Sequence, residues 1–193
     1  DLISQTKILE KILFENADIR KVLKRAHLLK LDNFYIGAGC IAQTVWNYLS
    51  GNSPNFGIKD IDLVYFDRAN LSYFDEDKII KKAEQVFSDI QIEIDIKNQA
   101  RVHLWYKKHF GFTIKPYSSL EDAINSWPTT ATSIGVKLDS KSNLVIYAPF
   151  GLNDLFGKII RANKTQITKE IYDQKVFRWS SVWPDLKILP WRN

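Results

Sequence analysis

The sequence has 193 residues, with 27 Lys and Arg against 22 Asp and Glu, which gives a formal net charge of +5. Its 45% hydrophobic and 25% charged residues are typical of a globular domain and exclude a disordered or fibrous chain. No apolar run approaches the roughly 20 residues that span a bilayer, no signal-peptide pattern is visible, and the single cysteine, Cys40, excludes an intrachain disulfide framework. We therefore expect a cytoplasmic protein without a membrane partner.

The expected elements alternate between helices and short strands, as judged from apolar spacing, caps and turn residues. In chain order they are helices at 3–14 and 18–29 (with Asp18 as N-cap), a strand at 34–36, a helix at 40–49, a strand at 60–66, a helix at 75–90, a strand at 92–96, a helix from the capping box at 118–121 to 127, a hairpin of 133–138 with 144–147, and helices near 152–161 and 168–182. No repeat or linker divides the chain. We expect one α/β (α+β) domain over 1–193, with its core at about 31–100, N-terminal helices over 1–30 and a C-terminal extension over 101–193.

A glycine turn joins the strand at 34–36 to the helix after it. The run Gly37-Ala38-Gly39 lets the backbone approach a ligand closely, and the free N–H groups of a helix N-terminus suit a phosphate. The pattern Gly37-x-Gly39-x-x-Ala42 also fits the dinucleotide fingerprint, which makes a Rossmann-type NAD-binding protein one alternative. Against it, two helices precede the turn, no second nucleotide-binding half follows, and Asp67, which ends the next strand, lies 28 positions after Gly39.

Paired carboxylates mark the next two strands. Asp60 and Asp62 are two positions apart and therefore emerge on one face of their strand, and Glu93 and Asp95 do the same on theirs. If the two strands are neighbours, three carboxylates converge near the glycine turn, with either Asp95 or Glu93 as the third. Such a cluster is costly unless cations neutralise it, and Mg²⁺ prefers oxygen ligands. The pattern indicates a two-metal site that could clamp the oxygens of a phosphoryl transfer.

The order of strand, glycine turn, helix, Asp-x-Asp strand, helix and acidic strand resembles the nucleotidyltransferase superfamily of DNA polymerase beta. Residues 35–41 look like the turn of poly(A) polymerase and CCA-adding heads, and 60–64 look like their metal-binding strand. Longer runs resemble a bacterial family called simply "nucleotidyltransferase family protein"; they are 98–106, 116–120, 127–132 and 148–152. This resemblance implies a polymerase-beta-like fold, with a short mixed sheet, flanking helices and extra C-terminal helices.

The resemblance also implies a reaction, the transfer of a nucleoside monophosphate from an NTP to a hydroxyl acceptor with release of pyrophosphate. Asp60 and Asp62 would bind two Mg²⁺ ions, and Asp95 would complete one site and act as general base. The expected nucleotide-binding residues are Ala38, Gly39, Cys40, Lys59 and Arg101.

Two departures from the superfamily pattern bear on activity. The 20 residues between Gly39 and Asp60 exceed the compact superfamily spacing. Cys40 and Ala42 stand where polymerase-like heads have a small residue and an Arg, so Arg101, Lys97 or Lys59 would have to supply the missing positive charge. These departures favour the main alternative, a non-catalytic nucleotide- or protein-binding module on the same fold.

The distribution of basic residues bears on the acceptor. A nucleic acid would require a basic stripe leading to the site, whereas the Lys and Arg residues are scattered, for example at 21, 24, 25, 81, 82, 107 and 108. Lysines opposite the apolar face of a helix usually form a solvated surface. We therefore expect a small molecule or a protein hydroxyl as acceptor.

Overall fold

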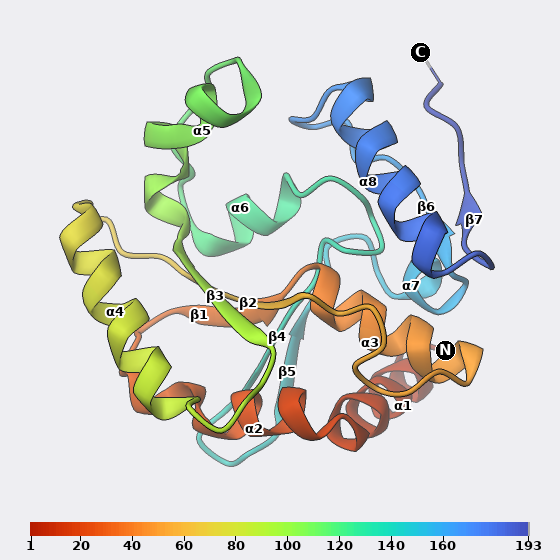
Figure 1. Cartoon of the computed structure of the whole chain (residues 1–193), viewed down its shortest axis with the longest axis horizontal. Coiled ribbons are helices and arrows are strands. Elements are labelled where there is room, and N and C mark those ends of the chain that lie inside the picture. The colour runs from red at the N-terminus through yellow and green to blue at the C-terminus, as the bar shows by residue number, and fades with distance from the viewer. Residues whose placement is uncertain (193) are drawn as a thin grey trace.

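The strands form a mixed five-stranded sheet whose order is β3-β2-β1-β4-β5. In this computed structural model, which describes residues 1–192 (Figure 1), the elements are α1 (Leu2–Glu15), α2 (Ala17–Arg25), η1 (Ala26–Leu29), β1 (Phe34–Gly37), α3 (Gly39–Ser50), β2 (Asp60–Tyr65), α4 (Tyr73–Val86), β3 (Glu93–Asn98), η2 (Gln99–Arg101), α5 (Val102–Phe110), α6 (Leu120–Asn125), β4 (Gly135–Leu138), β5 (Leu144–Tyr147), α7 (Asn153–Phe156), β6 (Ile159–Ile160), α8 (Lys169–Val182) and β7 (Lys187–Ile188). The short mixed sheet with flanking and C-terminal helices confirms the expected fold class.

The pairing of β2 with β3 is the feature that matters most for the site. These two strands are parallel, whereas the β1–β2, β1–β4 and β4–β5 pairs are antiparallel. A parallel pair needs a crossover, and α4 provides it. The register places Asp60 opposite Glu93 and Asp62 opposite Asp95. The two acidic strands are therefore neighbours, which was the condition for their carboxylates to converge.

One apolar core joins the N-terminal helices, the sheet and the C-terminal helix. It extends from Leu9 in α1 to Leu186 after α8. Trp46 of α3 is fully buried and packs edge-to-face against Trp179 and Trp183, with ring centroids 5.7 and 5.5 Å apart. The indole N–H of Trp183 donates to Asn47 Oδ1 at 2.7 Å. These contacts fix α8 against α3 and thereby set its position relative to the glycine turn.

Two predicted helix starts are wrong by one or two residues. The N-cap of α2 is Asn16, whose Oδ1 accepts hydrogen bonds from the N–H groups of Asp18 and Ile19. Asp18 instead lies in the first turn, where a negative charge favours the helix dipole. The N-cap of α6 is Ser119, which accepts from the N–H of Asp122 at 3.0 Å. In both cases another good capping side chain lies one or two positions from the predicted one.

The helix predicted near 152–161 is also wrong. It ends after the four residues of α7, and Lys158 then adopts a positive φ of 52° that no helix can accommodate. The chain continues as β6, which pairs in parallel with β7 in a two-stranded sheet. Of the helices in residues 1–192, none is long and apolar enough to cross a membrane.

Candidate active site

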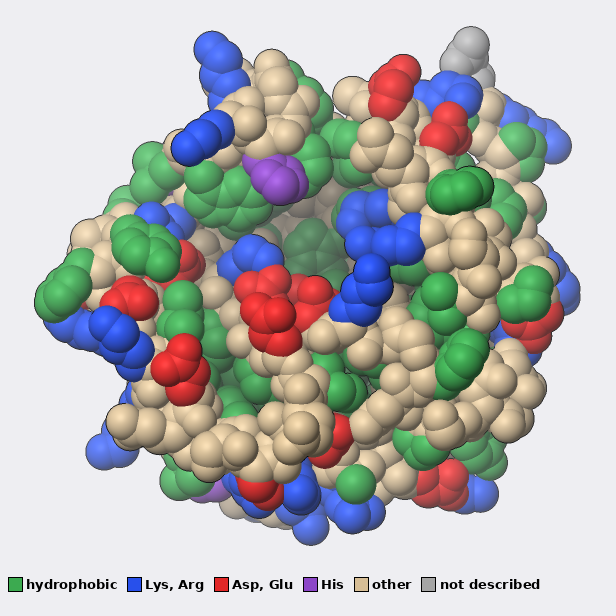
Figure 2. Space-filling view, in the orientation of Figure 1, with side chains coloured by type: hydrophobic (Ala, Val, Ile, Leu, Met, Phe, Trp, Pro, Cys, Tyr) green, Lys and Arg blue, Asp and Glu red, His purple; other side chains and the backbone are tan. Residues whose placement is uncertain are grey.

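A cavity of about 340 Å³ opens where β2, β3 and the start of α3 meet α5, α8 and the segment 117–128. In Figure 1, α5 and α8 stand on opposite sides of this region. Figure 2 shows the same face as a hollow, with Asp and Glu side chains gathered on one side and Lys and Arg side chains across from them. The cavity therefore has an acidic side and a basic side.

Three of the predicted carboxylates form the acidic side. Asp60, Asp62 and Asp95 all line the cavity. Burial and the neighbouring charges of Asp60 and Asp95 raise the pKa of Asp62 to about 7. Glu93, the alternative third carboxylate, is exposed and is absent from the described lining of the cavity. The structure thus brings Asp95, and not Glu93, to the Asp60–Asp62 pair.

Lys97 places a positive charge beside the three aspartates. It follows Asp95 on the same face of β3 and forms an ion pair with its carboxylate. Carboxylate oxygens are the donors that Mg²⁺ prefers, so the chemistry of the three aspartates fits that ion. Within residues 1–192, however, no group of three or more His, Cys, Asp or Glu side chains is arranged to hold a metal ion. A cation entering here would have to compete with Lys97 for Asp95.

The glycine turn lies beside these carboxylates. Gly37 pairs with Asp62 across β1 and β2, and Ala38 and Gly39 line the cavity. A Cβ at position 37 would lie 2.7 Å from the carbonyl oxygen of Ile134 and 2.9 Å from the ring of Trp127. Gly37 is thus required by close packing. The helix that begins at Gly39 has no side-chain cap, which leaves its first N–H groups free for an anion.

Cys40 lies in the turn but presents no reactive thiol. Its side chain is buried, and Sγ donates to the carbonyl oxygen of Gly37 at 3.1 Å. Burial and the nearby charge of Asp62 raise the pKa of the thiol far above its usual range. The thiol therefore stays neutral, and only the backbone N–H of Cys40 is available to a ligand.

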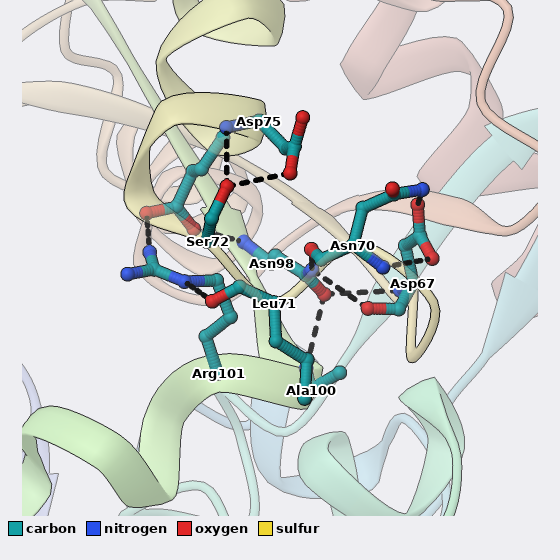
Figure 3. Close-up of polar contacts among 9 residues, drawn as sticks. Asp67, Asn70, Leu71, Ser72, Asp75, Asn98, Ala100 and Arg101 are labelled. Carbon is teal, nitrogen blue, oxygen red and sulfur yellow. Dashed lines mark hydrogen bonds and ion pairs between the residues drawn. The ribbon is translucent and has the colours of Figure 1, made fainter.

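Arg101 and Lys59, two predicted nucleotide-binding residues, are not among the described residues that line the cavity. Lys59 is exposed. Arg101 forms an ion pair with Glu76 of α4, and its Nε donates to the carbonyl oxygen of Leu71 at 2.9 Å (Figure 3). Both partners of the Arg101–Glu76 pair are nearly buried, so leaving either unpaired would be costly. Arg101 thus holds α4 to the end of β3.

Asn98 completes this support. Its backbone N–H donates to Glu76 Oε2 at 2.7 Å, and its side-chain oxygen accepts from the N–H groups of Asp67 and Ala100 (Figure 3). Its amide nitrogen donates to the carbonyl oxygens of Asp67 and Asn70. These bonds fix the C-terminal end of β3, and with it the positions of Lys97, directly before Asn98, and of Asp95, three residues before it.

The basic side of the cavity consists of Lys175 and Arg178 of α8, together with Lys97 of β3. Sequence reasoning considered Lys97 as a source of positive charge but missed Lys175 and Arg178. Lys175, Arg178 and Trp179 share one helical face, because residues three and four apart are neighbours on a helix. This spacing in the sequence predicts that the three side chains share one face of the helix. It does not predict that this face of α8 packs toward the aspartates of β2 and β3.

Aromatic side chains line the rest of the cavity. They are Trp105, Tyr106 and Phe110 of α5, Tyr117, Trp127 and Trp179. The hydroxyl of Tyr117 lies 2.8 Å from Ser126 Oγ and donates to Gln166 Oε1 at 3.0 Å. Flat aromatic faces beside an anion site are suited to a nucleobase, because every base can stack on them.

Comparison with known proteins identifies a matching family and solved structures with a similar fold. The sequence model of a family described as "Nucleotidyltransferase" matches residues 24–188. A solved NMR structure described as a CCA-adding enzyme head domain superposes with a TM-score of 0.77 at 27% identity, covering 94% of this chain and 96% of that one. A CCA-adding enzyme in complex with ATP has a TM-score of 0.54 at 19% identity, and a tRNA-processing enzyme in an apo form has 0.51 at 17%.

The last two matches include 93% and 91% of this chain but only 41% and 44% of those longer proteins. At this level of identity, these two matches show the fold alone. The comparison with curated proteins gave no match. The family match spans most of the chain, and the head-domain match confirms the polymerase-beta-like architecture. The chain belongs to this nucleotidyltransferase family and is an enzyme of nucleotidyl transfer.

Proposed function

We propose that this chain transfers a nucleoside monophosphate from an NTP to a hydroxyl acceptor in the cytoplasm, with Mg²⁺ and with release of pyrophosphate. The observation that carries the proposal is the meeting of Asp60, Asp62 and Asp95 with the uncapped start of α3 in one cavity. The likeness to a head domain of a CCA-adding enzyme supports it, as does the ATP complex of a more distant structural neighbour.

The aspartates have separate roles in this proposal. Asp60, Asp62 and Asp95 would hold Mg²⁺, which when bound supplies charge neutralisation for the triphosphate and for the reacting oxygens. Asp95 also accepts the proton of the acceptor hydroxyl as general base. The turn at Ala38 and the N–H groups of Gly39 and Cys40 bind phosphate oxygens. The aromatic side chains orient the nucleoside by stacking.

We propose a small molecule or a protein hydroxyl as the acceptor. Several basic residues outside the cavity are paired with acids on the surface: Lys21 and Arg25 share Asp89, and Lys81 pairs with Asp77. Such pairs reduce the positive potential available to a nucleic-acid backbone. An RNA acceptor is the competing possibility, because the structural neighbours include a CCA-adding enzyme and a tRNA-processing enzyme.

A binding module without turnover is the second candidate function. The ion pair between Lys97 and Asp95 favours it, because this pair engages the carboxylate that would act as general base. In that case the protein would hold a nucleotide in the cavity without releasing pyrophosphate.

One experiment separates these functions. Each common NTP is supplied with Mg²⁺ and with a panel of small-molecule, protein and RNA acceptors, and pyrophosphate release is measured. We expect release that requires Mg²⁺ and is lost in Asp60→Asn, while Asp32→Asn, an equally exposed change before β1, retains it. Nucleotide binding without release across the whole panel would identify a binding module. Salt-sensitive binding of tRNA, single-stranded RNA or duplex DNA, followed by transfer to it, would replace the proposed acceptor with a nucleic acid.

A further inference from the structure

The C-terminal helix α8 presents two cations to the cavity. Lys175 is half-buried and Arg178 is exposed, and both line the cavity that also contains Asp60 and Asp62. Neither side chain has a hydrogen bond or an ion pair with any residue in the part of the chain that the structure describes. The ammonium group of Lys175 lies only over the ring of Trp179, 5.8 Å from its centroid.

These two cations differ from others on the same helix. Lys169, one and a half turns before Lys175, forms an ion pair with Asp173 at the exposed i,i+4 position. Lys175 and Arg178 lie one turn apart and repel each other without such a partner. Burial and the charge of Arg178 lower the pKa of Lys175. The charges of Asp62 and Asp60 oppose this shift in part. Keeping the half-buried Lys175 charged still costs free energy, which a bound anion would offset.

Packing fixes the position of this pair in advance. Trp179 follows Arg178 directly, is buried, and packs on Trp46 of α3. The C-terminal end of α8 is also held to α3, by the hydrogen bond that Trp183 donates to Asn47. The basic face of α8 is therefore held opposite the start of α3 by the core of the protein. A preorganised cationic face loses little entropy when an anion binds.

We propose that Lys175 and Arg178 of α8, together with Lys97 of β3, form the binding site for the polyphosphate of the donor nucleotide. This inference rests on the proposed function and assigns its donor phosphates to particular side chains. Arg178 supplies a planar guanidinium that can bind two phosphate oxygens at once, and Lys175 supplies a point charge deeper in the cavity.

The arrangement also assigns a role to Lys97. Its ion pair with Asp95 holds it at the boundary between the acidic and the basic sides. A polyphosphate bound between α3 and α8 offers Lys97 a second anionic partner. Transfer of Lys97 from Asp95 to the phosphates would free Asp95 at the moment when the donor nucleotide is in place.

The test measures the binding of inorganic tripolyphosphate, which carries the phosphates without a nucleoside, by titration calorimetry in excess Mg²⁺. We expect Lys175→Gln and Arg178→Gln each to weaken its affinity about tenfold or more, the loss typical of a charge-assisted hydrogen bond. The matched control is Lys169→Gln, which removes the same charge from the same helix away from the cavity and should leave the affinity within about twofold. Lys175→Arg should keep most of the affinity.

Thermal unfolding followed by circular dichroism checks that the variants fold. Because Arg178 is exposed, its variant keeps the test valid even if Lys175→Gln does not fold. Unchanged tripolyphosphate affinity in both variants, an equal loss in the Lys169 control, or no binding by the unmodified protein would overturn the inference. Tripolyphosphate binding that depends on α8, without pyrophosphate release from any NTP, would instead contradict the proposed function and leave this anion site in place.

Discussion

Asp62 lies directly opposite Asp95 across the parallel pairing of β2 and β3. Both side chains point into the cavity that Asp60 also lines, so three negative charges meet at one edge of the sheet. Lys97 balances part of this charge through its ion pair with Asp95. The protein thus carries internal repulsion at the site where a cation and a polyphosphate are proposed to bind.

The first prediction concerns stability and pH in the absence of divalent metal. The pKa of Asp62 is raised to about 7 in the folded chain, against about 3.9 in an unfolded one. Between these values the folded state binds one more proton than the unfolded state, so the free energy of unfolding falls as pH rises. The contribution of Asp62 is fully present below about pH 4 and is lost by the time pH passes 7. The slope is at most about 1.4 kcal/mol per pH unit.

Chemical denaturation in EDTA at a series of pH values from 5 to 8 measures this slope. In Asp62→Asn the contribution disappears, so the difference in stability between the variant and the unmodified protein should grow in favour of the variant as pH rises. Asp32→Asn, an exposed change elsewhere, should leave the pH dependence as it is. Parallel curves for the unmodified protein and Asp62→Asn would show that Asp62 does not titrate in this range.

The second prediction distinguishes Asp95 from Glu93, two acidic residues on the same face of β3. Asp95 lines the cavity opposite Asp62, whereas Glu93 is exposed opposite Asp60. Asp95→Asn should reduce pyrophosphate release at least about 100-fold, the range for a lost general base. Glu93→Gln is the matched control and should retain activity within about threefold. Equal losses of pyrophosphate release in the two variants would contradict the prediction, because Glu93 would then be as important for the reaction as Asp95.

The local parts of the site could be read from the sequence. The two-residue spacing of Asp60 and Asp62 sets their common face on any strand, because strand side chains alternate. The glycine turn and the helix after it follow from Gly37 and Gly39 in the same way. Lys97 was considered as a source of positive charge, and the structure places it in the cavity.

Parts of the site that depend on tertiary packing could not be read in this way. Nothing near Arg101 in sequence indicates that Glu76, 25 positions earlier, is nearly buried and needs a cation. Lys175 and Arg178 reach the cavity because Trp179 and Trp183 pack on Trp46, a contact that spans more than 130 residues. A helical pattern defines the face of α8 but not the partner against which it packs.

The third prediction tests the close packing at the glycine turn. A Cβ on Gly37 would approach the carbonyl oxygen of Ile134 to 2.7 Å, and backbone cannot move aside as a flexible side chain can. Gly37→Ala should therefore destabilise the protein by about 1–3 kcal/mol, the usual cost of overpacking.

Gly39→Ala, two positions later, is its matched control. The nearest atom to a Cβ there is Nε2 of Gln43 at 3.1 Å, the far end of a movable side chain. Its free energy of unfolding, measured by urea titration, should stay within about 0.5 kcal/mol of the unmodified protein. If Gly37→Ala proved as stable as Gly39→Ala, β1 would not approach the segment at Ile134 as closely as described.

The fourth prediction concerns Ala38, whose backbone is strained at the point where α3 begins. Its φ of 58° and ψ of −136° fall in a region that glycine adopts far more readily than a residue with a Cβ. The N–H of Ala38 donates to the carbonyl oxygen of Ile134 at 3.0 Å, which helps to hold this conformation. Ala38→Gly removes the Cβ conflict and should raise the free energy of unfolding by about 1 kcal/mol, after the greater freedom of glycine in the unfolded chain is subtracted.

Ala42→Gly, the same substitution four residues later, is the control, and we expect it to change the free energy of unfolding in the opposite direction. Ala42 is fully buried within α3, so Ala42→Gly should lower the free energy of unfolding by about 1 kcal/mol or more, through the loss of helix propensity and of a buried methyl group. Urea titrations of the two variants give both values. If both variants lost stability, the turn before α3 would not have the conformation on which the proposed phosphate contacts depend.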